Sequence, residues 1–369
     1  MADPSGPYLT GPHRIRVLDG VRGIAILLVI ASHAEMSAHS GSSEWLARLG
    51  DLGVKLFFVL SGFLITRLLL QEQDRTGRID YWHFMVRRAF RILPPAYVFI
   101  VAVMIAAAFG VVVLNSGDAV HALTYTTDFS TPSWWLGHLW SLSIEEQFYV
   151  LWPLLLGLVR PRISLYLMIG SLALAAVCRG VLLVVFPELT DGIERSFVVA
   201  LDGFGAGGLL AALMPRLTRS RLYLRMLESW WAPLLILPAA GLDLLEHHPL
   251  VFYVVLQTVI YLLLAVWLHR CLAVSDDWLA RALGSRMLSW LGLISYSLYL
   301  WQQPFLAPRD VQLVHSFPLA LALALACATC SYFLVEQPFL RLRDRVVSSR
   351  TSTVRPSPPP STGPVAGVS

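Results

Sequence analysis

Two side chains that can carry a charge or a proton, Arg22 and His33, lie within the first long apolar stretch, Leu18 to Ala38. A charged or titratable group at bilayer depth costs about 2.5 kcal/mol or more to insert, so it rarely lies there without a role. Eleven residues separate the pair, which on an α-helix amounts to three turns plus about 20°. We therefore expect both side chains on one helix face, about 16 Å apart along the axis. Either residue alone could be a satisfied polar group in a helix bundle, but the pair favours a function along a path across a membrane.

A second cluster holds three arginines, Arg87, Arg88 and Arg91, where a later apolar segment begins. Arg88 and Arg91 are three residues apart, so on a helix they share a face and could together hold a multiply charged phosphate group. The alternative is that the arginines extend toward the lipid headgroups and anchor the helix at the membrane surface. The pattern leaves both interpretations open.

Two adjacent carboxylates, Glu145 and Glu146, stand in the most specific motif, Trp-Ser-Leu-Ser-Ile-Glu-Glu-Gln-Phe-Tyr at 140–149. Neighbouring residues on a helix point about 100° apart, so one carboxylate can face a cavity while the other faces a headgroup or a partner chain. A carboxylate beside an imidazole fixes its tautomer and stabilises the imidazolium during proton transfer. We therefore expect one of the two carboxylates to lie beside His33.

The remaining clusters are accounted for by packing and membrane anchoring. Gly62 follows Ser61 in an otherwise bulky run, and we expect a close helix crossing there. The Tyr- and Trp-rich segment 294–304 fits an aromatic belt at the membrane surface, and Glu336 fits a pair with a neighbouring arginine. The four cysteines lie in or at the ends of apolar segments, so we expect neither a disulfide framework nor a metal site.

The composition indicates a membrane protein. Hydrophobic residues make up 56% of the chain and charged residues 14%, and the mean hydropathy of +0.64 is far from the value of a soluble domain. Apolar segments long enough to cross about 30 Å of hydrocarbon recur along the chain. We predict an all-α, polytopic bundle of about ten transmembrane helices, at roughly Leu18–Ala38, Leu52–Leu70, Pro95–Leu114, Leu139–Val159, Ser164–Phe186, Phe197–Met214, Trp230–Leu245, Val251–Leu272, Met287–Ala307 and Phe317–Val335.

The distribution of basic residues supports this arrangement. With the N-terminus in the cytoplasm, most of the 28 Lys and Arg residues fall in segments on that same side, as the positive-inside rule expects. We therefore predict that both termini are cytoplasmic. The net charge of +4 then reflects contact with the inner lipid leaflet, and we expect no nucleic-acid partner.

The chain divides into three predicted parts. Residues 1–13 form an N-terminal cytoplasmic segment, residues 14–345 the membrane domain, and residues 346–369 a disordered Pro- and Ser-rich cytoplasmic tail. No soluble catalytic domain is apparent, so we expect any chemistry to take place within the membrane domain.

Six motifs, in order over about residues 14–343, together resemble the bacterial type-3 membrane acyltransferase family. They are Leu-Asp-Gly-Val-Arg-Gly with His33, Phe-Phe-Val-Leu-Ser-Gly-Phe-Leu, Arg-x-x-Arg, Trp-Ser-Leu-Ser-Ile-Glu-Glu-Gln-Phe-Tyr, Ser-Tyr-Ser-Leu-Tyr-Leu-Trp and Glu336-x-Pro. The resemblance implies a ten-span O-acyltransferase of the cytoplasmic (inner) membrane. Such a protein takes an acyl group, usually acetyl, from cytoplasmic acyl-CoA and delivers it to a hydroxyl of a glycan or glycoside on the outer side.

The resemblance also implies roles for the polar residues. Arg88 and Arg91, with Arg22 deeper in the membrane, would hold the phosphates of acyl-CoA. His33 would act either as general base on the acceptor hydroxyl or as an acyl-carrying nucleophile, and the sequence does not choose. Glu145 is expected as the partner of His33 in preference to Glu146, because it stands at the equivalent motif position.

Two positions depart from the family pattern. Family members commonly carry a His after Leu-Tyr-Leu-Trp, where this chain has Gln302, so a role of that residue in proton transfer cannot be carried over. Gln337 stands where a basic residue usually follows the terminal Glu, which weakens the predicted ion pair of Glu336. Some relatives also carry an extracytoplasmic hydrolase-like domain. Without one, the membrane domain must suffice or a separate partner must help.

Two other functional classes stay open. A proton-coupled transporter would also place His, Arg and Glu within the membrane, although no internal repeat between the two halves is visible. A non-catalytic scaffold or export subunit is the other, and the intact His33, Glu145 and arginines argue against it.

The acceptor is not readable from the sequence. We expect it to be chosen by the outer loops at 41–50, 115–137 and 187–195, and a lipid or secondary-metabolite hydroxyl is an alternative to a glycan. Trp134 and Trp135 in the second loop could stack on a sugar, but anchoring at the headgroups is favoured slightly. The oligomeric state is not indicated either.

Overall fold

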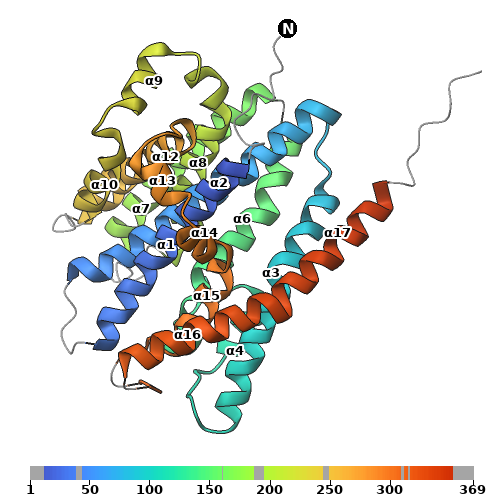
Figure 1. The fold of residues 1–369 in the computed structure, drawn as a ribbon, viewed down its shortest axis with the longest axis vertical. Coiled ribbons are helices and arrows are strands. Elements are labelled where there is room, and N and C mark those ends of the chain that lie inside the picture. Colours follow the sequence, from blue (N-terminus) through green and yellow to red (C-terminus); the bar gives the residue numbers. More distant parts are fainter. Residues whose placement is uncertain are drawn as a thin grey trace, which may run out of the picture.

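The computed structural model describes residues 12–38, 44–159, 161–186, 195–243, 249–308, 311–314 and 316–351. These residues form helices and connecting turns without a single strand (Figure 1). Within the described part, seven helices are long and apolar enough to cross a bilayer. The predicted fold class, an all-α polytopic membrane bundle, is confirmed.

The longer helices make up the body of the bundle. They are α1 (Pro12–Ala38), α2 (Glu44–Thr76), α3 (Tyr81–Ala108), α6 (Leu139–Leu158), α7 (Pro161–Val185), α8 (Phe197–Leu217), α12 (Gln257–Ala273), α16 (Phe317–Ser331) and α17 (Gln337–Thr351). Shorter helical pieces connect them: α4 (Asp118–Thr124), η1 (Thr127–Phe129), α5 (Trp134–Gly137), α9 (Arg221–Glu228), η4 (Ala232–Leu235), α10 (Ile236–Asp243), α11 (Pro249–Val251), η5 (Phe252–Leu256), α13 (Trp278–Leu283), α14 (Arg286–Leu293), α15 (Ser295–Gln302) and η6 (Tyr332–Glu336).

Three of the ten predicted spans differ from the long apolar helices. The span predicted at 139–159 is one 20-residue helix, α6, which carries Glu145 and Glu146. The span predicted at 230–245 is a short apolar helix, Ala232–Asp243. The span predicted at 287–307 is broken at Ile294, where α14 ends and α15 begins. The number ten therefore stays a prediction.

The described residues cover the predicted domain boundaries only in part. Helix α1 begins at Pro12, inside the segment predicted at 1–13, and α17 continues past residue 345 to Thr351. Residues 352–369, where most of the disordered tail was predicted, lie outside the described residues. The same holds for residues 41–43 and 187–194 of the predicted outer loops.

Helix α2 lies at the centre of the bundle, where it packs against α1 and α8 (Figure 1). A Cβ atom on Gly62 of α2 would overlap the backbone carbonyl oxygen of Phe204, and one on Gly207 of α8 would overlap that of Val59. Only glycine allows two helix backbones to approach this closely. The close crossing predicted at Gly62 is confirmed.

Buried ion pairs hold other helices together. The guanidinium of Arg179 on α7 donates to the carboxylate of Asp202 on α8 at 2.6 Å and to Thr258 on α12 at 2.8 Å. The ammonium of Lys55 on α2 lies 2.5 Å from the carboxylate of Asp243 on α10. Each of these cations is paired, which offsets the desolvation of a buried charge.

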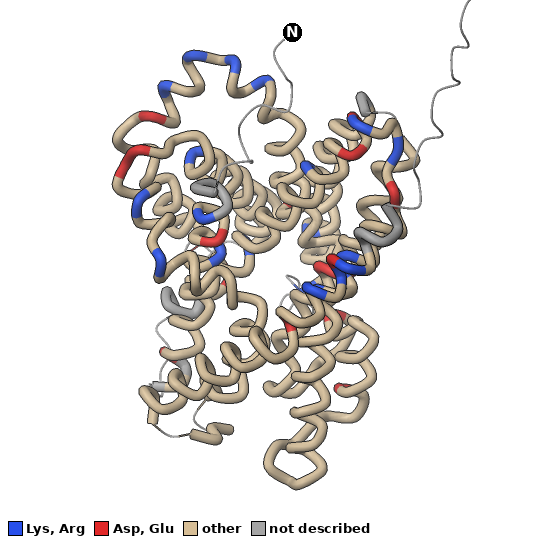
Figure 2. Tube along the Cα trace, turned by 45° about the vertical axis from the view of Figure 1, so that its right-hand side comes forward, with Lys and Arg blue, Asp and Glu red and all other residues tan. Residues whose placement is uncertain are grey.

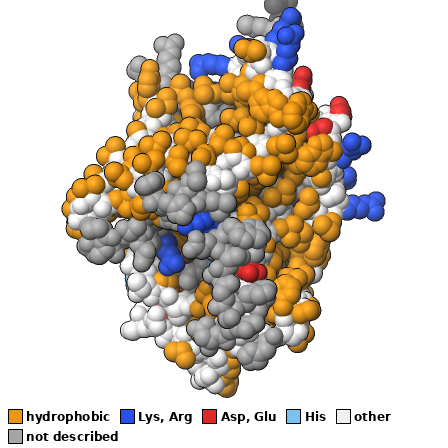
Figure 3. Space-filling model, turned by 90° about the vertical axis from the view of Figure 1, so that its left-hand side faces the viewer, with side chains coloured by type: hydrophobic (Ala, Val, Ile, Leu, Met, Phe, Trp, Pro, Cys, Tyr) orange, Lys and Arg blue, Asp and Glu red, His pale blue; other side chains and the backbone are white. Residues whose placement is uncertain are grey.

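The surface has the character of a lipid-facing bundle. Figure 3 shows a wide hydrophobic surface on one side of the molecule. Helix α7 exposes Val177, Val181 and Val184, which share one helix face. Lys and Arg gather mostly toward the end that holds α9 and the turn between α2 and α3, while the opposite end, at α4, is nearly free of them (Figure 2). This asymmetry is the one that the positive-inside rule describes, and the chain is a multi-pass membrane protein.

Candidate active site

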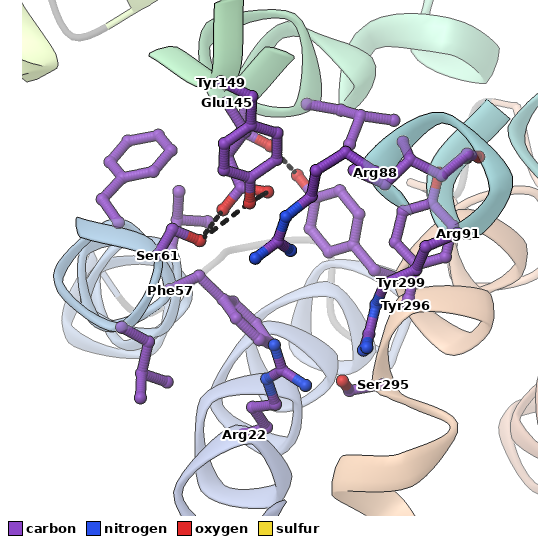
Figure 4. A pocket seen from close by; sticks show the side chains of 16 residues that line it. Arg22, Phe57, Ser61, Arg88, Arg91, Glu145, Tyr149, Ser295, Tyr296 and Tyr299 are labelled. Carbon is purple, nitrogen blue, oxygen red and sulfur yellow. Dashed lines mark hydrogen bonds between the residues drawn. The ribbon is translucent and has the colours of Figure 1, made fainter. Parts of the chain in front are cut away.

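A cavity of about 80 Å³ lies between α1, α2, α3, α6 and α15 (Figure 4). We call it the arginine cavity. Its lining residues are Arg22, Val54, Phe57, Phe58, Leu60, Ser61, Arg88, Arg91, Ile92, Ser141, Leu142, Glu145, Tyr149, Ser295, Tyr296 and Tyr299. All three arginines predicted to bind phosphate, Arg22, Arg88 and Arg91, are therefore brought together although they come from two helices.

The three guanidinium groups point into this cavity (Figure 4). Among the described residues, none of them forms a hydrogen bond or an ion pair with another side chain or with the backbone. Arg179 and Lys55, which are buried, are both paired with carboxylates, whereas the three cavity arginines are only partly buried. Three convergent, unpaired cations inside a membrane bundle are arranged to receive a multiply charged anion.

Arg88 is held in place by aromatic rings. Its guanidinium carbon lies 5.0 Å from the ring centroid of Tyr149 and 5.6 Å from that of Phe84. Cation–π contacts of this kind fix the plane of a guanidinium without using its N–H donors. The donors of Arg88 remain directed at the cavity.

Glu145 also lines the arginine cavity, together with Ser61 and Tyr149 (Figure 4). Its carboxylate accepts hydrogen bonds from the hydroxyl of Ser61 at 2.8 Å and from that of Tyr149 at 3.3 Å. Ser61 thereby has a polar partner that the sequence interpretation, which treated the Ser-Gly pair only as a helix crossing, did not assign.

A second cavity, of about 290 Å³, contains His33, and we call it the histidine cavity. It is lined by Val29, Ser32, His33, Gly50, Asp51, Val54, Pro132, Ser133, Trp134, Gly137, His138, Trp140, Arg195, Tyr299 and Gln303. Val54 and Tyr299 belong to the walls of both cavities. The arginine and histidine cavities are thus neighbours, separated by the side chains of these two residues.

His33 is oriented by Gln302. Its Nδ1–H donates to the side-chain carbonyl oxygen of Gln302 at 2.5 Å, since that oxygen can only accept. The proton is then on Nδ1, and Nε2 carries the free lone pair. Trp134 packs edge-on against the imidazole with ring centroids 5.4 Å apart, and its indole N–H donates to the backbone carbonyl of Gln303 at 3.0 Å.

The predicted contact between His33 and Glu145 is wrong. Helix α6 starts beside the histidine cavity, where His138 lines the wall with His33. Glu145 lies seven residues further along the helix, about 10 Å deeper, and so reaches the arginine cavity instead. The hydrogen-bond partner of the His33 imidazole is therefore the side-chain amide of Gln302 and not a carboxylate.

His138 is the functional candidate that sequence reasoning missed. Its ring lies between those of Phe99 and Tyr299, with centroid distances of 5.3 and 5.4 Å. The sequence offered one signal for it: His138 stands seven residues before Glu145. On a helix this spacing places the two side chains on one face, and the same argument linked Arg22 with His33.

Glu146 and Glu336 lie apart from both cavity walls. The Oε1 atom of Glu146 is buried without a hydrogen-bond partner among the described residues. Glu336 is buried and accepts a hydrogen bond from Ser297 at 2.9 Å, so its partner is a hydroxyl of α15 and not the arginine predicted. In the part of the chain that the structure describes, no group of three or more His, Cys, Asp or Glu side chains is placed to hold a metal ion.

Comparison with known proteins gives a consistent result. The family described as "Acyltransferase domain" matches residues 15–337. The chain is 31% identical to a Bacillus subtilis protein named "Putative peptidoglycan O-acetyltransferase", over 90% of this chain and 56% of that one. It is 29% identical to a peptidoglycan O-acetyltransferase of Listeria monocytogenes, over 87% of this chain and 55% of that one. An O-acetyltransferase of Staphylococcus aureus is 27% identical, over 89% and 57% of the two chains.

The chain therefore spans about half the length of the curated relatives that it matches. No solved structure matches it.

Proposed function

The chain belongs to the acyltransferase-domain family, and from that premise we propose that it is a membrane O-acetyltransferase. The donor is a cytoplasmic acyl-CoA, with acetyl as the acyl group, and the acceptor is a hydroxyl of a glycan outside the cytoplasmic membrane. The observation that carries the proposal is the set of three unpaired arginines in one cavity, next to a second cavity that holds His33.

The donor end of the reaction lies at the arginine cavity. CoA presents several phosphate charges, and Arg22, Arg88 and Arg91 offer planar donor groups that match phosphate oxygens. The pantetheine arm of CoA, on the order of 15–20 Å long, matches the distance of about 16 Å along α1 from Arg22 to His33. The thioester would then pass between Val54 and Tyr299 into the histidine cavity.

The chemical step takes place at His33. The acceptor oxygen attacks the thioester carbonyl carbon while Nε2 of His33 removes the hydroxyl proton. The new C–O ester bond forms, the C–S bond breaks, and the CoA thiolate leaves and takes up the proton. In the alternative order, Nε2 attacks first and forms an acyl-histidine, which the acceptor hydroxyl then cleaves. Trapping of acyl-labelled protein distinguishes the two orders.

The acceptor is a carbohydrate on the side of the membrane opposite the basic residues. Two of the relatives are named for peptidoglycan, which supports a glycan over a lipid or a secondary metabolite. Pro132, Ser133 and Trp134, from the connection between α3 and α6, line the histidine cavity, and α4 of the same connection lies at the end of the bundle that is nearly free of Lys and Arg (Figure 2).

The proposal is tested with purified full-length protein, acetyl-CoA labelled in the acetyl group, and oligomers of N-acetylglucosamine as acceptors. Mass spectrometry should detect an added acetyl ester that alkali removes, and it should disappear in the His33→Ala variant. Acetyl-CoA consumption without an ester on any carbohydrate would contradict a glycan acceptor. A lack of CoA binding would contradict the donor.

A further inference from the structure

A third cavity, of about 540 Å³, lies in the connection between α3 and α6. We call it the loop cavity. Its lining residues are Asn115, Ser116, Asp118, His121, Phe129, Ser130 and Thr131. It belongs to neither the arginine cavity nor the histidine cavity, and nothing in the proposed reaction at His33 uses it.

The lining of the loop cavity fits a neutral, hydroxyl-rich ligand. Every lining residue except Phe129 is polar, and none is Lys or Arg. The amide, hydroxyl and imidazole groups can donate or accept hydrogen bonds, whereas the carboxylate of Asp118 is buried and bonded to the loop backbone. A phosphate or another strong anion would call for cations such as those of the arginine cavity. The absence of Lys and Arg from this wall therefore favours an uncharged partner.

Phe129 adds an apolar platform to this polar cavity. It stands at the end of η1 and its side chain is 71% exposed. A sugar ring carries hydroxyl groups at its rim and C–H groups on its faces, so it can make hydrogen bonds while one face stacks on an aromatic ring. A polar cavity with one exposed aromatic side chain has the composition that a sugar residue requires.

The cavity is fixed by its own hydrogen bonds. The carboxylate of Asp118 is only 3% exposed and accepts the backbone N–H groups of Asn115 at 2.8 Å and Ser133 at 3.1 Å. The side-chain amide of Asn115 donates to the carbonyl of Thr131 at 3.2 Å. Both ends of the loop are thus tied together before any ligand arrives, which lowers the entropy cost of binding.

The loop cavity adjoins the histidine cavity along the chain. Thr131 lines the loop cavity, and the next three residues, Pro132, Ser133 and Trp134, line the histidine cavity. The hydrogen bond from Ser133 to Asp118 joins the two walls. A ligand longer than one sugar could therefore occupy both cavities at once.

We propose that the loop cavity is a sugar-binding subsite, which holds one residue of an oligomeric glycan while a neighbouring residue presents its hydroxyl to His33. This inference rests on the proposed O-acetyltransferase function. It adds that a polymer or an oligomer is a better acceptor than a single sugar, because only a chain can span the two cavities.

The test compares Phe129→Leu with Phe129→Tyr, using N-acetylglucosamine, its dimer and longer oligomers as acceptors with acetyl-CoA. Leucine keeps the apolar bulk that membrane anchoring needs but loses the ring, whereas tyrosine keeps the ring. We expect Phe129→Leu to lower kcat/KM for longer oligomers about 2- to 12-fold, the range expected of one aromatic contact. Transfer to the monomer should stay unchanged, and Phe129→Tyr should behave as the parent protein does.

Phe109→Leu is the matched control. Phe109 is 82% exposed at the end of α3 and lines none of the three cavities. The change should therefore leave transfer to the monomer and to the oligomers unaffected. A second variant, Ser116→Trp, fills the loop cavity from an exposed position and should abolish the preference for longer oligomers. The subsite would be overturned if Phe129→Leu lowered kcat/KM equally for the monomer and the oligomers. It would also be overturned if Phe109→Leu lowered kcat/KM for the oligomers as much as Phe129→Leu does.

A failure of the subsite is distinguishable from a failure of the proposed function. If the parent protein transfers acetyl groups to no acceptor, the function is contradicted, and calorimetric titration with the longer oligomers still tests the subsite. Binding that weakens in Phe129→Leu and Ser116→Trp but not in Phe109→Leu would support it. Binding that none of these variants changes would contradict it.

Discussion

At the scale of single residues, the arginines sort into two groups by their partners. Arg179 lies deep in the bundle and satisfies its charge with Asp202. Arg22, Arg88 and Arg91 are partly buried and keep their donors directed at a cavity. Because an unpaired charge in such a place lowers stability, these three are expected to gain their partner when a ligand binds.

The first prediction concerns the donor. Arg88→Ala or Arg91→Ala should weaken CoA binding more than tenfold, since each charge-assisted hydrogen bond is worth about 1.5–3 kcal/mol. Lysine at either position should restore only part of the affinity, because an ammonium lacks the planar pair of donors. The loss should shrink at high salt, where screening has already weakened the contact in the parent protein. Titration of the purified protein with CoA measures all three effects.

Arg87→Ala is the control for this prediction. Arg87 precedes Arg88 on α3 but lines neither the arginine cavity nor the histidine cavity. If the arginines act only as membrane anchors, Arg87→Ala and Arg88→Ala should reduce membrane abundance alike, and correctly inserted protein should bind CoA normally. That pattern would show that the phosphates of CoA bind outside the arginine cavity.

The second prediction concerns His33 and its orienting partner. His33→Ala should lower acetyl transfer by at least the 10²- to 10⁴-fold that a general base typically contributes, while CoA binding at the arginine cavity remains. Gln302→Leu, which removes the acceptor of the Nδ1–H bond, should lower the rate less and leave KM for acetyl-CoA unchanged. Steady-state kinetics gives the rate of acetyl transfer, and titration of the same preparations gives the affinity for CoA. Normal transfer by His33→Ala would contradict the role of His33 in the chemical step.

At the scale of helices, one face of α1 and one face of α6 each connect the two cavities. Arg22 and Glu145 line the arginine cavity, and His33 and His138 line the histidine cavity. Helical spacing alone predicts that Arg22 and His33 share a face, and it would equally have linked His138 with Glu145. The relative depth of two helices is not readable from spacing, which is why His33 and Glu145 were wrongly paired.

The broken helices were equally hard to foresee. The apolar segment 287–307 has the length and composition of one span, yet it divides at Ile294. The division places Ser295, Tyr296 and Tyr299 on the cavity walls. Hydropathy reports how apolar a segment is and does not report where a helix within it ends. The close crossing at Gly62 was predictable because a glycine within a run of bulky residues typically marks a point where another helix backbone approaches.

The third prediction tests the connection between the cavities. Val54→Phe should fill the wall that both cavities share and block transfer to the acceptor, while CoA still binds to the arginines. Val101→Phe adds the same bulk at an exposed position of α3 and should leave both properties unchanged. Undiminished transfer by Val54→Phe would mean that the acyl group takes another route.

The fourth prediction concerns the crossing of α2 and α8. Gly62→Ala places a methyl group against the carbonyl of Phe204, and overpacking of this kind costs about 1–3 kcal/mol of stability. Gly157→Ala on α6 meets no atom within 4 Å and should be neutral or slightly stabilising. Thermal unfolding in detergent compares the two variants, and an equal effect of both would contradict the packing described.

At the scale of the whole molecule, the bundle joins a basic end to an end poor in cations (Figure 2). The arginine cavity and the histidine cavity follow one another along α1, from Arg22 toward the later His33. This arrangement fits the proposed function, in which a cytoplasmic donor and an acceptor outside the cytoplasmic membrane meet within one protein. The loop cavity, as proposed, lies beyond the histidine cavity on this path and binds a further sugar residue of the acceptor.

The most direct test of the account is sided transfer in sealed vesicles that hold the protein in one known orientation. Labelled acetyl-CoA is added on the face that exposes α9 and the α2–α3 turn, and N-acetylglucosamine oligomers are enclosed on the other face. We predict that label appears as acetyl ester on the enclosed glycan, and that it is lost in His33→Ala and in the double Arg88→Ala, Arg91→Ala variant. Label on the glycan only when donor and acceptor share one face, or full transfer by either variant, would contradict the central claim.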